Sequence, residues 1–227
     1  MDASRIAHLL EPFLEGNVLS KTQLEDISTY IDILQRWNTR INLTAIRNPD
    51  EIVTRHFGES LFAARHLFPN PSAYSASSAV KAFEVADLGS GAGFPGIPIK
   101  LWAPEISLTL IESNHKKATF LRELARALTL TNINIQNTRA ESIINKKFDV
   151  VTLRAVEHFE STLPIAASLL KPNGRIALLI GSSQLPTAQA ILASFYWREP
   201  VAIPASDSRV LLLGSFTPWL DQRESTQ

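Results

Sequence analysis

The chain has 227 residues, and its 22 Lys and Arg side chains balance 22 Asp and Glu side chains, so the formal net charge is zero. The overall charge therefore gives no support for nucleic-acid binding. Any such function has to depend on local clusters of basic residues. The chain contains no cysteine, which excludes disulfides, thiolate metal ligands and a cysteine nucleophile.

The first 72 residues are expected to form a helical extension that contacts the substrate. A first apolar stripe recurs at helical spacing and is made by Leu24, Ile27, Ile31 and Leu34. Asn48 followed by Pro49, with Glu51 two residues later, predicts that another helix begins at Pro49. Its apolar side would be formed by Ile52, Phe57, Leu61, Ala64 and Leu67. A polar and aromatic connector, residues 37–46, separates the two helices.

After a small, polar linker at residues 70–80, short apolar runs alternate with helical stretches. The expected strands are Phe83–Leu88, Ser107–Ile111, Ile133–Gln136, Phe148–Leu153, Arg175–Ile180 and Arg209–Leu213. This alternation predicts a doubly wound, Rossmann-like α/β domain with a mainly parallel sheet over residues 80–218. Residues 219–227 are expected to be a polar tail.

A glycine-rich loop follows the first expected strand, with the sequence Asp-Leu-Gly-Ser-Gly-Ala-Gly-Phe-Pro-Gly at residues 87–96. Glycines allow a sharp turn and a close approach of the backbone to a ligand, and such sheets bind ligands at the carboxyl ends of their strands. Gly89, Gly91 and Gly93 are therefore candidate cofactor residues. The alternative is a tight turn that binds no ligand.

Two cofactor classes fit a loop of this kind. A dinucleotide would place its pyrophosphate at the helix N-terminus, where Asp87 would bring a second negative charge. S-adenosylmethionine has no phosphate, and its cationic amino and sulfonium groups are favourable beside a carboxylate. Glu112 ends the second strand and can accept hydrogen bonds from the ribose hydroxyls of either cofactor. Asp87 therefore favours S-adenosylmethionine over NAD. Glu141 follows the third strand, where an adenine ring would lie, although by itself it is typical of a surface acid.

Several motifs together resemble the bacterial glucose-inhibited division protein B family of 16S ribosomal RNA (guanine-527-N7) methyltransferases. They are the glycine loop, Trp37–Arg47, Ile52–Phe57, Ser60-Leu61, Leu110–Lys117, Phe120–Arg122, Arg139–Glu141 and Arg154-Ala155. The most specific are Asn-Leu-Thr at residues 42–44 and Gly-Phe-Pro-Gly-Ile-Pro at residues 93–98. The resemblance implies methyl transfer from S-adenosylmethionine to guanine N7, with cofactor contacts at Gly89, Phe94, Ala140, Glu141 and Arg154. The sequence departs from the family pattern at Ile180-Gly181, where the family often has a lysine before the glycine.

Independently of the family resemblance, the residues also restrict which type of atom can accept the methyl group. Methylation of a pyrimidine carbon commonly uses a cysteine, and this chain has none. The stretch Thr-Leu-Arg-Ala at residues 152–155 differs from the Asn/Asp-Pro-Pro-aromatic pattern of exocyclic amino methylation. A ring nitrogen such as guanine N7 already carries a lone pair and needs alignment, not deprotonation. We therefore expect no general base and a positioning role for Arg154. Oxygen and small-molecule acceptors remain open.

Two segments, 36–66 and 115–126, are net positive within the neutral chain and are candidates for contact with RNA phosphates. The candidate substrate residues are Asn42, Arg47, Arg55, His56, Lys116, Lys117 and Arg122. Alternatively, these basic side chains belong to a solvent-exposed helix face that does not bind RNA. Trp37 could stack on a base, but core packing is favoured.

The expected partner is 16S ribosomal RNA within the small subunit, and we expect a cytoplasmic monomer without metal. Two other functions stay open: methylation of a small molecule or protein, and a non-catalytic role as an RNA-binding ribosome assembly factor.

Overall fold

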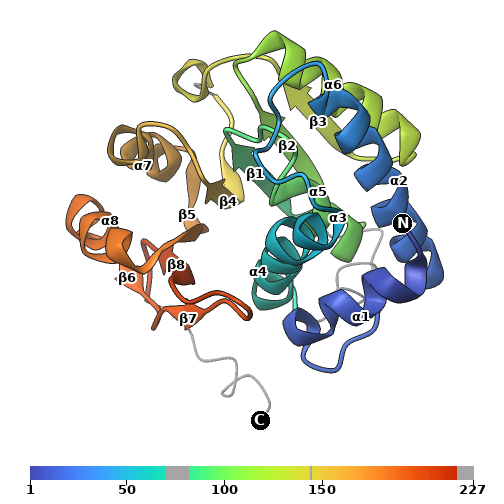
Figure 1. The fold of residues 1–227 in the computed structure, drawn as a ribbon. Coiled ribbons are helices and arrows are strands. Elements are labelled where there is room, and N and C mark those ends of the chain that lie inside the picture. Colours follow the sequence, from blue (N-terminus) through green and yellow to red (C-terminus); the bar gives the residue numbers. More distant parts are fainter. Residues whose placement is uncertain (70–81, 144, 219–227) are drawn as a thin grey trace.

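A central sheet flanked by helices organises the computed structural model, which describes residues 1–69, 82–143 and 145–218 (Figure 1). The strands are β1 (Glu84–Leu88), β2 (Ser107–Ile111), β3 (Ile133–Gln136), β4 (Phe148–Arg154), β5 (Leu170–Gly181), β6 (Tyr196–Trp197), β7 (Val201–Ala202) and β8 (Arg209–Ser215). The helices are α1 (Ala3–Leu14), α2 (Lys21–Asn38), α3 (Pro49–Glu51), η1 (Ile52–Gly58), α4 (Glu59–Leu67), α5 (Gly96–Trp102), α6 (His115–Ala127), η3 (Ala140–Ser142), α7 (Phe159–Ser168), η4 (Ser182–Gln184) and α8 (Leu185–Ile191).

The strand order is β3-β2-β1-β4-β5-β8-β6, with β7 paired to β8. Strands β1 to β5 are parallel, and β8 runs antiparallel to β5. This arrangement confirms the predicted doubly wound, mainly parallel α/β sheet. All six expected strands are present, and only the fifth differs much, because β5 begins at Leu170 and not at Arg175. The expected linker at residues 70–80 and the tail at residues 219–227 lie outside the described residues.

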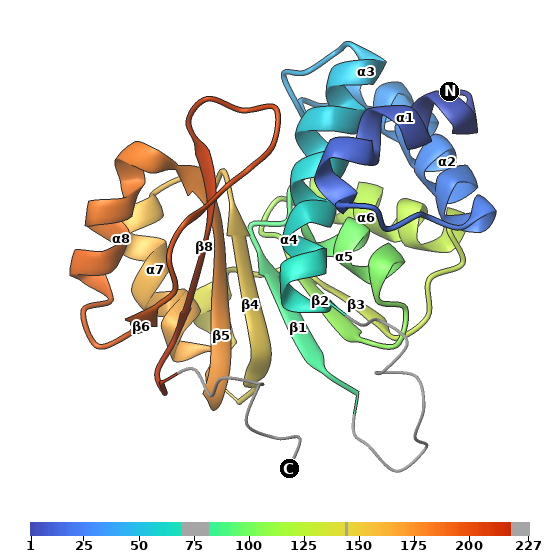
Figure 2. The same cartoon turned by 90° about the horizontal axis from the view of Figure 1, so that it is seen from below.

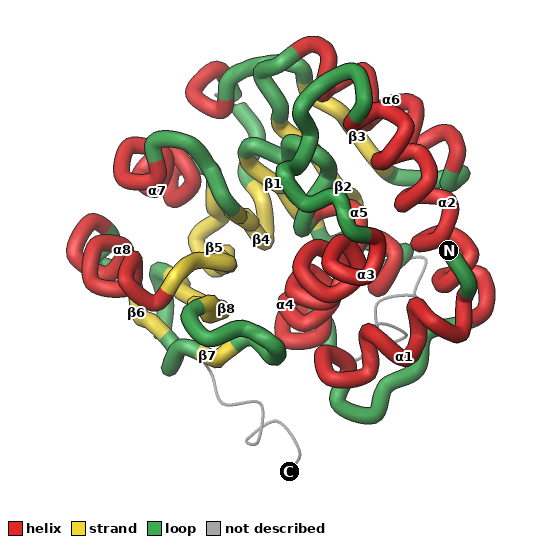
Figure 3. The backbone as a smooth tube through the Cα atoms, in the orientation of Figure 1, coloured by secondary structure: helices red, strands yellow, loops and turns green. Residues whose placement is uncertain are grey.

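Alternate strand residues face opposite helical layers, as the period of two in a β-strand requires. Val85 packs in a core with α1, α2, α4, α5 and α6, whereas its neighbour Ala86 packs in a second core with α7 and α8. Figure 2 shows these two layers on either side of the sheet, and Figure 3 distinguishes the helices, in red, from the strands between them, in yellow. The N-terminal helices therefore share one core with the sheet.

The run of helix from Pro49 to Leu67 starts where the sequence predicts. The Asn48 side chain accepts a hydrogen bond from the backbone N–H of Asp50 at 2.9 Å, and all five residues of the predicted apolar side are buried. The sequence did not predict that its middle, η1, is a π-helix, a form found in short pieces that are frequent at functional sites. Within the described ranges, no helix is long and apolar enough to cross a membrane.

Candidate functional site

A pocket of about 780 Å³ lies where strands β1, β2 and β4 reach their carboxyl ends. Its wall combines the loop after β1, the turn after β2, the η3 segment and the loop after β4. The N-terminal part contributes Leu43, Thr44 and His56 to the same wall. The pocket is therefore at the edge of the sheet where α/β folds of this kind bind their ligands.

The glycine loop bends into this pocket. Gly89 and Gly91 both have positive φ angles, of 66° and 54°, which side-chain-bearing residues rarely adopt. A Cβ atom at Gly89 would lie 3.0 Å from a side-chain carbon of Val156, which also lines the pocket. Gly93 differs from the expectation, since it does not line the pocket. A Cβ atom there would lie 2.5 Å from the Tyr30 hydroxyl, so Gly93 allows the loop to pack against α2.

Glu112 lines the pocket with a carboxylate that the backbone holds in place. Its Oε2 accepts a hydrogen bond from Gly91 N at 2.9 Å, and its Oε1 accepts one from Asn114 N at 2.7 Å. The residue is only 6% exposed, so the carboxylate has little freedom to turn away. Each carboxylate oxygen can accept a further hydrogen bond. Glu112 thus links the two loops and lies on the pocket wall just past the end of β2.

Asp87 is buried and does not line the pocket, which corrects the expectation that its carboxylate faces the cofactor. Its Oδ1 accepts a hydrogen bond from the Thr152 hydroxyl at 2.8 Å, and its Oδ2 accepts one from Gly96 N at 3.3 Å. The side chain therefore connects β1 to β4 and to the start of α5. Burial raises the pKa of Asp87 to about 7, and the hydrogen bonds from Thr152 and Gly96 oppose that shift.

An Asp87→Asn variant is expected to become more stable relative to the wild type as pH rises from about 4 to 7. The pKa of Asp87 is about 7 when folded and 3.8 in its ordinary state. In this window the unfolded wild type ionises while the folded protein retains its proton, so folding of the wild type is progressively penalised. Each pKa unit corresponds to about 1.4 kcal/mol, so the relative change should reach a few kcal/mol. Urea denaturation of both proteins at pH 5 and pH 8 measures it, and parallel pH profiles would contradict the assignment.

The other predicted cofactor residues lie together. Phe94, Ala140, Glu141 and Arg154 all line the pocket with Gly89, Gly91 and Glu112. The Phe94 ring is stacked between the Tyr30 ring, with centroids 5.1 Å apart, and the His56 ring, with centroids 4.7 Å apart. This packing explains why an aromatic residue follows the glycines, because it holds the loop against the N-terminal helices.

The predicted substrate residues are not all brought together. His56 and Lys117 line the pocket, and Arg55 is exposed on η1 next to His56. The remaining four do not line it. Asn42 and Lys116 are exposed, Arg47 donates a hydrogen bond to the Asn38 carbonyl, and Arg122 is half-buried on α6. Trp37 packs edge-on against Phe120, with centroids 5.9 Å apart, which agrees with the favoured core role.

His56 is a neutral side chain at the pocket wall. Its Nε2 lies 2.8 Å from the Thr44 hydroxyl oxygen, and its Nδ1 is buried with no partner among the described residues. Burial, followed by the positive charges of Arg154, Arg55 and Arg209, lowers the pKa of His56 to about 3. The imidazole therefore carries no charge near neutral pH and is unsuited to accept a proton there.

The residue that sequence reasoning missed is Glu59, whose side chain is only 1% exposed. Its carboxylate forms ion pairs with Arg55 at 3.2 Å, Arg154 at 3.1 Å and Arg209 at 2.9 Å. A local signal existed only for Arg55, which lies four residues before Glu59 on the same helical run. Arg154 is thereby held by its Nε and Nη2, and Nη2 also donates to the Arg55 carbonyl.

Comparison with known proteins places the chain in a family. A family model described as rRNA small subunit methyltransferase G, GidB, matches residues 23–197. A protein from Roseiflexus sp. (strain RS-1), named ribosomal RNA small subunit methyltransferase G, is 35% identical over 210 residues, which is 87% of this chain and 85% of that protein. The chain belongs to this methyltransferase family. A relative of the same name from Xanthomonas axonopodis pv. citri is 36% identical over 180 residues, 79% of each chain.

Membership in the GidB family confirms the resemblance inferred from the motifs and the prediction that the chain is a methyltransferase. A solved structure agrees on the fold. The ribosomal protein L11 methylase from Lactobacillus delbrueckii subsp. bulgaricus superimposes with a TM-score of 0.56 at 22% identity, covering 71% of this chain and 78% of that one. This likeness supports the Rossmann-like sheet and says nothing further about the substrate.

Proposed function

We propose that this member of the GidB family transfers a methyl group from S-adenosylmethionine to N7 of a guanine in 16S ribosomal RNA, at position 527, within the small subunit. The proposal is carried by the pocket in which Glu112, the glycine loop and the loop after β4 meet at one edge of the sheet. The names of the relatives, which specify ribosomal RNA of the small subunit, support it.

The residues present fit S-adenosylmethionine. Glu112 offers two oxygens, each with hydrogen-bonding capacity left, for the ribose hydroxyls. Ala140 and Glu141 follow β3 and line the same pocket, where the adenine would be bound, and Gly89 lines it without a side chain. When bound, this cofactor supplies an electrophilic methyl group on a positively charged sulfur. Asp87 contributes indirectly, because its carboxylate holds the loop by accepting a hydrogen bond from Gly96 N.

The pocket is expected to align the reactants without His56, Asp87 or Arg154 acting as a base near neutral pH. His56 has a pKa of about 3, and Asp87, whose carboxylate accepts hydrogen bonds from Thr152 and Gly96, does not line the pocket. Arg154 remains charged and is held by Glu59, so it can orient a substrate atom but cannot accept a proton. This set of side chains suits an acceptor such as guanine N7, which attacks through an existing lone pair and needs only proximity and orientation.

The single-turnover rate of methyl transfer is therefore expected to be nearly flat between about pH 6.5 and 8.5, a window that covers an ordinary histidine pKa. Rapid-quench measurements with saturating RNA and cofactor test this. An Arg154→Ala variant should be slower at every pH without acquiring pH dependence. A steep rise with one ionisation that disappears on changing a single Asp, Glu or His would show a general base and refute the mechanism.

The function itself is tested by transfer of a radiolabelled methyl group. Purified small subunits, naked 16S ribosomal RNA and a cell extract are offered in parallel, and the labelled product is digested to nucleosides. We expect label in 7-methylguanosine at one position of 16S ribosomal RNA, and no label when that guanine is replaced by 7-deazaguanine. Label in a protein or a small metabolite, or in another nucleoside, would overturn the proposal.

A further inference from the structure

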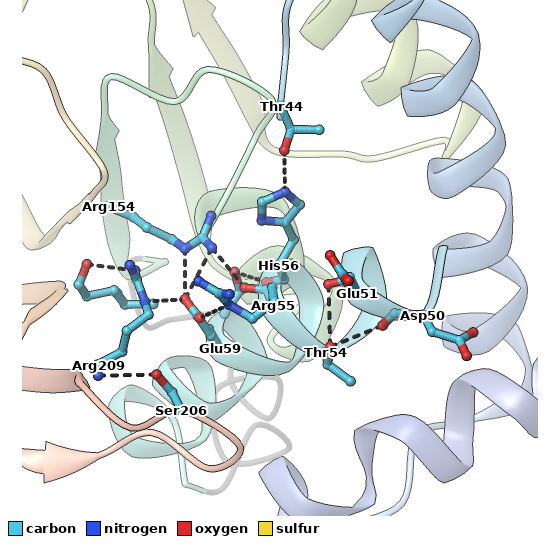
Figure 4. A network of polar contacts seen from close by, with 12 residues as sticks. Thr44, Asp50, Glu51, Thr54, Arg55, His56, Glu59, Arg154, Ser206 and Arg209 are labelled. Carbon is cyan, nitrogen blue, oxygen red and sulfur yellow. Dashed lines mark hydrogen bonds and ion pairs between the residues drawn. The ribbon is translucent and has the colours of Figure 1, made fainter. Parts of the chain in front are cut away.

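Three arginines from distant parts of the chain converge on Glu59 (Figure 4). Arg55 comes from η1, Arg154 is the last residue of β4, and Arg209 is the first residue of β8. Arg209 pairs with Gly181 at the end of β5, so Arg154 and Arg209 both lie at the carboxyl edge of the sheet. We refer to these four residues as the Glu59 cluster.

The Glu59 cluster carries more positive than negative charge. Three guanidinium groups face one carboxylate, which leaves two positive charges in surplus, and no second carboxylate pairs with these arginines in the described ranges. Two of the three are well covered, since the side chains of Arg154 and Arg209 are 9% and 19% exposed. Charges taken out of water without a partner are costly, so this arrangement favours an additional anion. Burial is the main cause of the lowered pKa of His56, and the positive charges of the three arginines add to it.

Several donors of the cluster remain available. Arg55 uses only its Nε toward Glu59, and its Nη1 and Nη2 have no hydrogen-bond partner within the described part of the chain. Arg209 lies 2.9 Å from Glu59 through its Nε, but that N–H is buried and makes no hydrogen bond, so the contact is an ion pair and Nη1 is the donor left to this side chain among the described residues. Its Nη2 donates to the Leu179 carbonyl. Arginine forks with free N–H groups are well suited to bind the oxygens of a phosphate.

The position of the free N–H donors indicates from which side the anion approaches the cluster. Arg154 lines the pocket, whereas Arg55 and Arg209 flank it without belonging to its wall. The Arg55 side chain is 48% exposed, so its donors are accessible from outside the pocket. Of the three arginines in the cluster, a carboxylate of a ligand inside the pocket would meet only Arg154. An anion that approaches from solvent would meet Arg55 first.

We propose that the Glu59 cluster binds one backbone phosphate of the RNA next to the target nucleotide, through Arg55 and Arg209. This inference rests on the proposed function and specifies how its substrate is held. Glu59 keeps the three guanidinium groups at one point, and the phosphate neutralises the charge that Glu59 leaves unpaired. The contact would anchor the strand at the carboxyl edge of β4, next to the methyl-transfer pocket.

The test compares Arg55→Gln with Arg5→Gln, since Arg5 is a matched arginine on α1 whose side chain is 52% exposed and pairs with Asp50. Affinity for small subunits is measured from about 50 to 200 mM salt, and cofactor affinity by calorimetry. Arg55→Gln should weaken subunit binding about 3- to 10-fold and reduce the slope of log K against log salt by about 0.7–0.9, the loss of one phosphate contact. Cofactor affinity should change less than about twofold. Arg5→Gln should match the wild type, and Arg55→Lys should recover most of the slope.

An Arg55→Gln variant with the wild-type salt slope would overturn the phosphate site. So would weakened cofactor binding with an unchanged slope, because the anion would then be the cofactor carboxylate. Failure of the proposed function is distinguishable, since a wild-type chain that leaves ribosomal RNA unmethylated would refute that proposal before any variant is compared.

Discussion

Glu59→Gln is expected to lower the free energy of unfolding by about 3 kcal/mol, near the lower end of the range for breaking a buried ion pair. The substitution preserves the size of the side chain and removes the one negative charge shared by three arginines. Arg154 is then left covered and without a counter-charge. The loss stays near the lower end because Arg55 is half-exposed and can turn toward water. Urea denaturation at constant pH and salt measures the difference.

The matched control for this prediction is Glu51→Gln, an exposed acid on the same helical run. It should change the free energy of unfolding by less than about 0.5 kcal/mol, as is usual for surface positions. An equal, small loss in both variants would mean that the Glu59 cluster contributes little to stability. Methyl transfer by Glu59→Gln should also slow, because Arg154 loses the partner that orients it.

Replacing Glu112 by Ala is expected to weaken cofactor binding at least about 100-fold. The variant loses the charged acceptor for two ribose hydroxyls, and a hydrogen bond to a charged group is worth about 1.5–3 kcal/mol, with about 1.4 kcal/mol for each factor of ten. It also releases Gly91 N and Asn114 N, which the carboxylate holds in the wild type. Calorimetric titration with S-adenosylmethionine measures the dissociation constant directly.

The control for Glu112 is Glu105→Ala, an exposed acid in the turn before β2, which should bind the cofactor as the wild type does. Titration with NAD should give no heat of binding in any of the proteins. Equal affinity of the wild type and Glu112→Ala would remove Glu112 from the site. Tight binding of NAD would contradict the choice of cofactor.

Sequence patterns predict most of the elements because those patterns are local. Strands such as Ser107–Ile111 and Ile133–Gln136 have the bounds that the apolar runs indicate, and the helix that starts at Pro49 follows its cap. Glu112 was located in the same way, since a residue just past a strand end must lie at the carboxyl edge. Asp87 shows the limit of this reasoning. It lies within β1, opposite Thr152 of β4, and its side chain turns into the protein.

The sequence by itself determined the fold class, the glycine loop and the family, since each depends on residues that are neighbours along the chain. Only the tertiary structure decided that Glu59, Arg154 and Arg209 meet, and that His56 is a neutral group at the pocket wall. The reason is physical. Local periodicity sets which face of an element is buried, but it does not specify which distant side chain lies opposite. The charge state of a side chain depends on that neighbour and on the water removed around it.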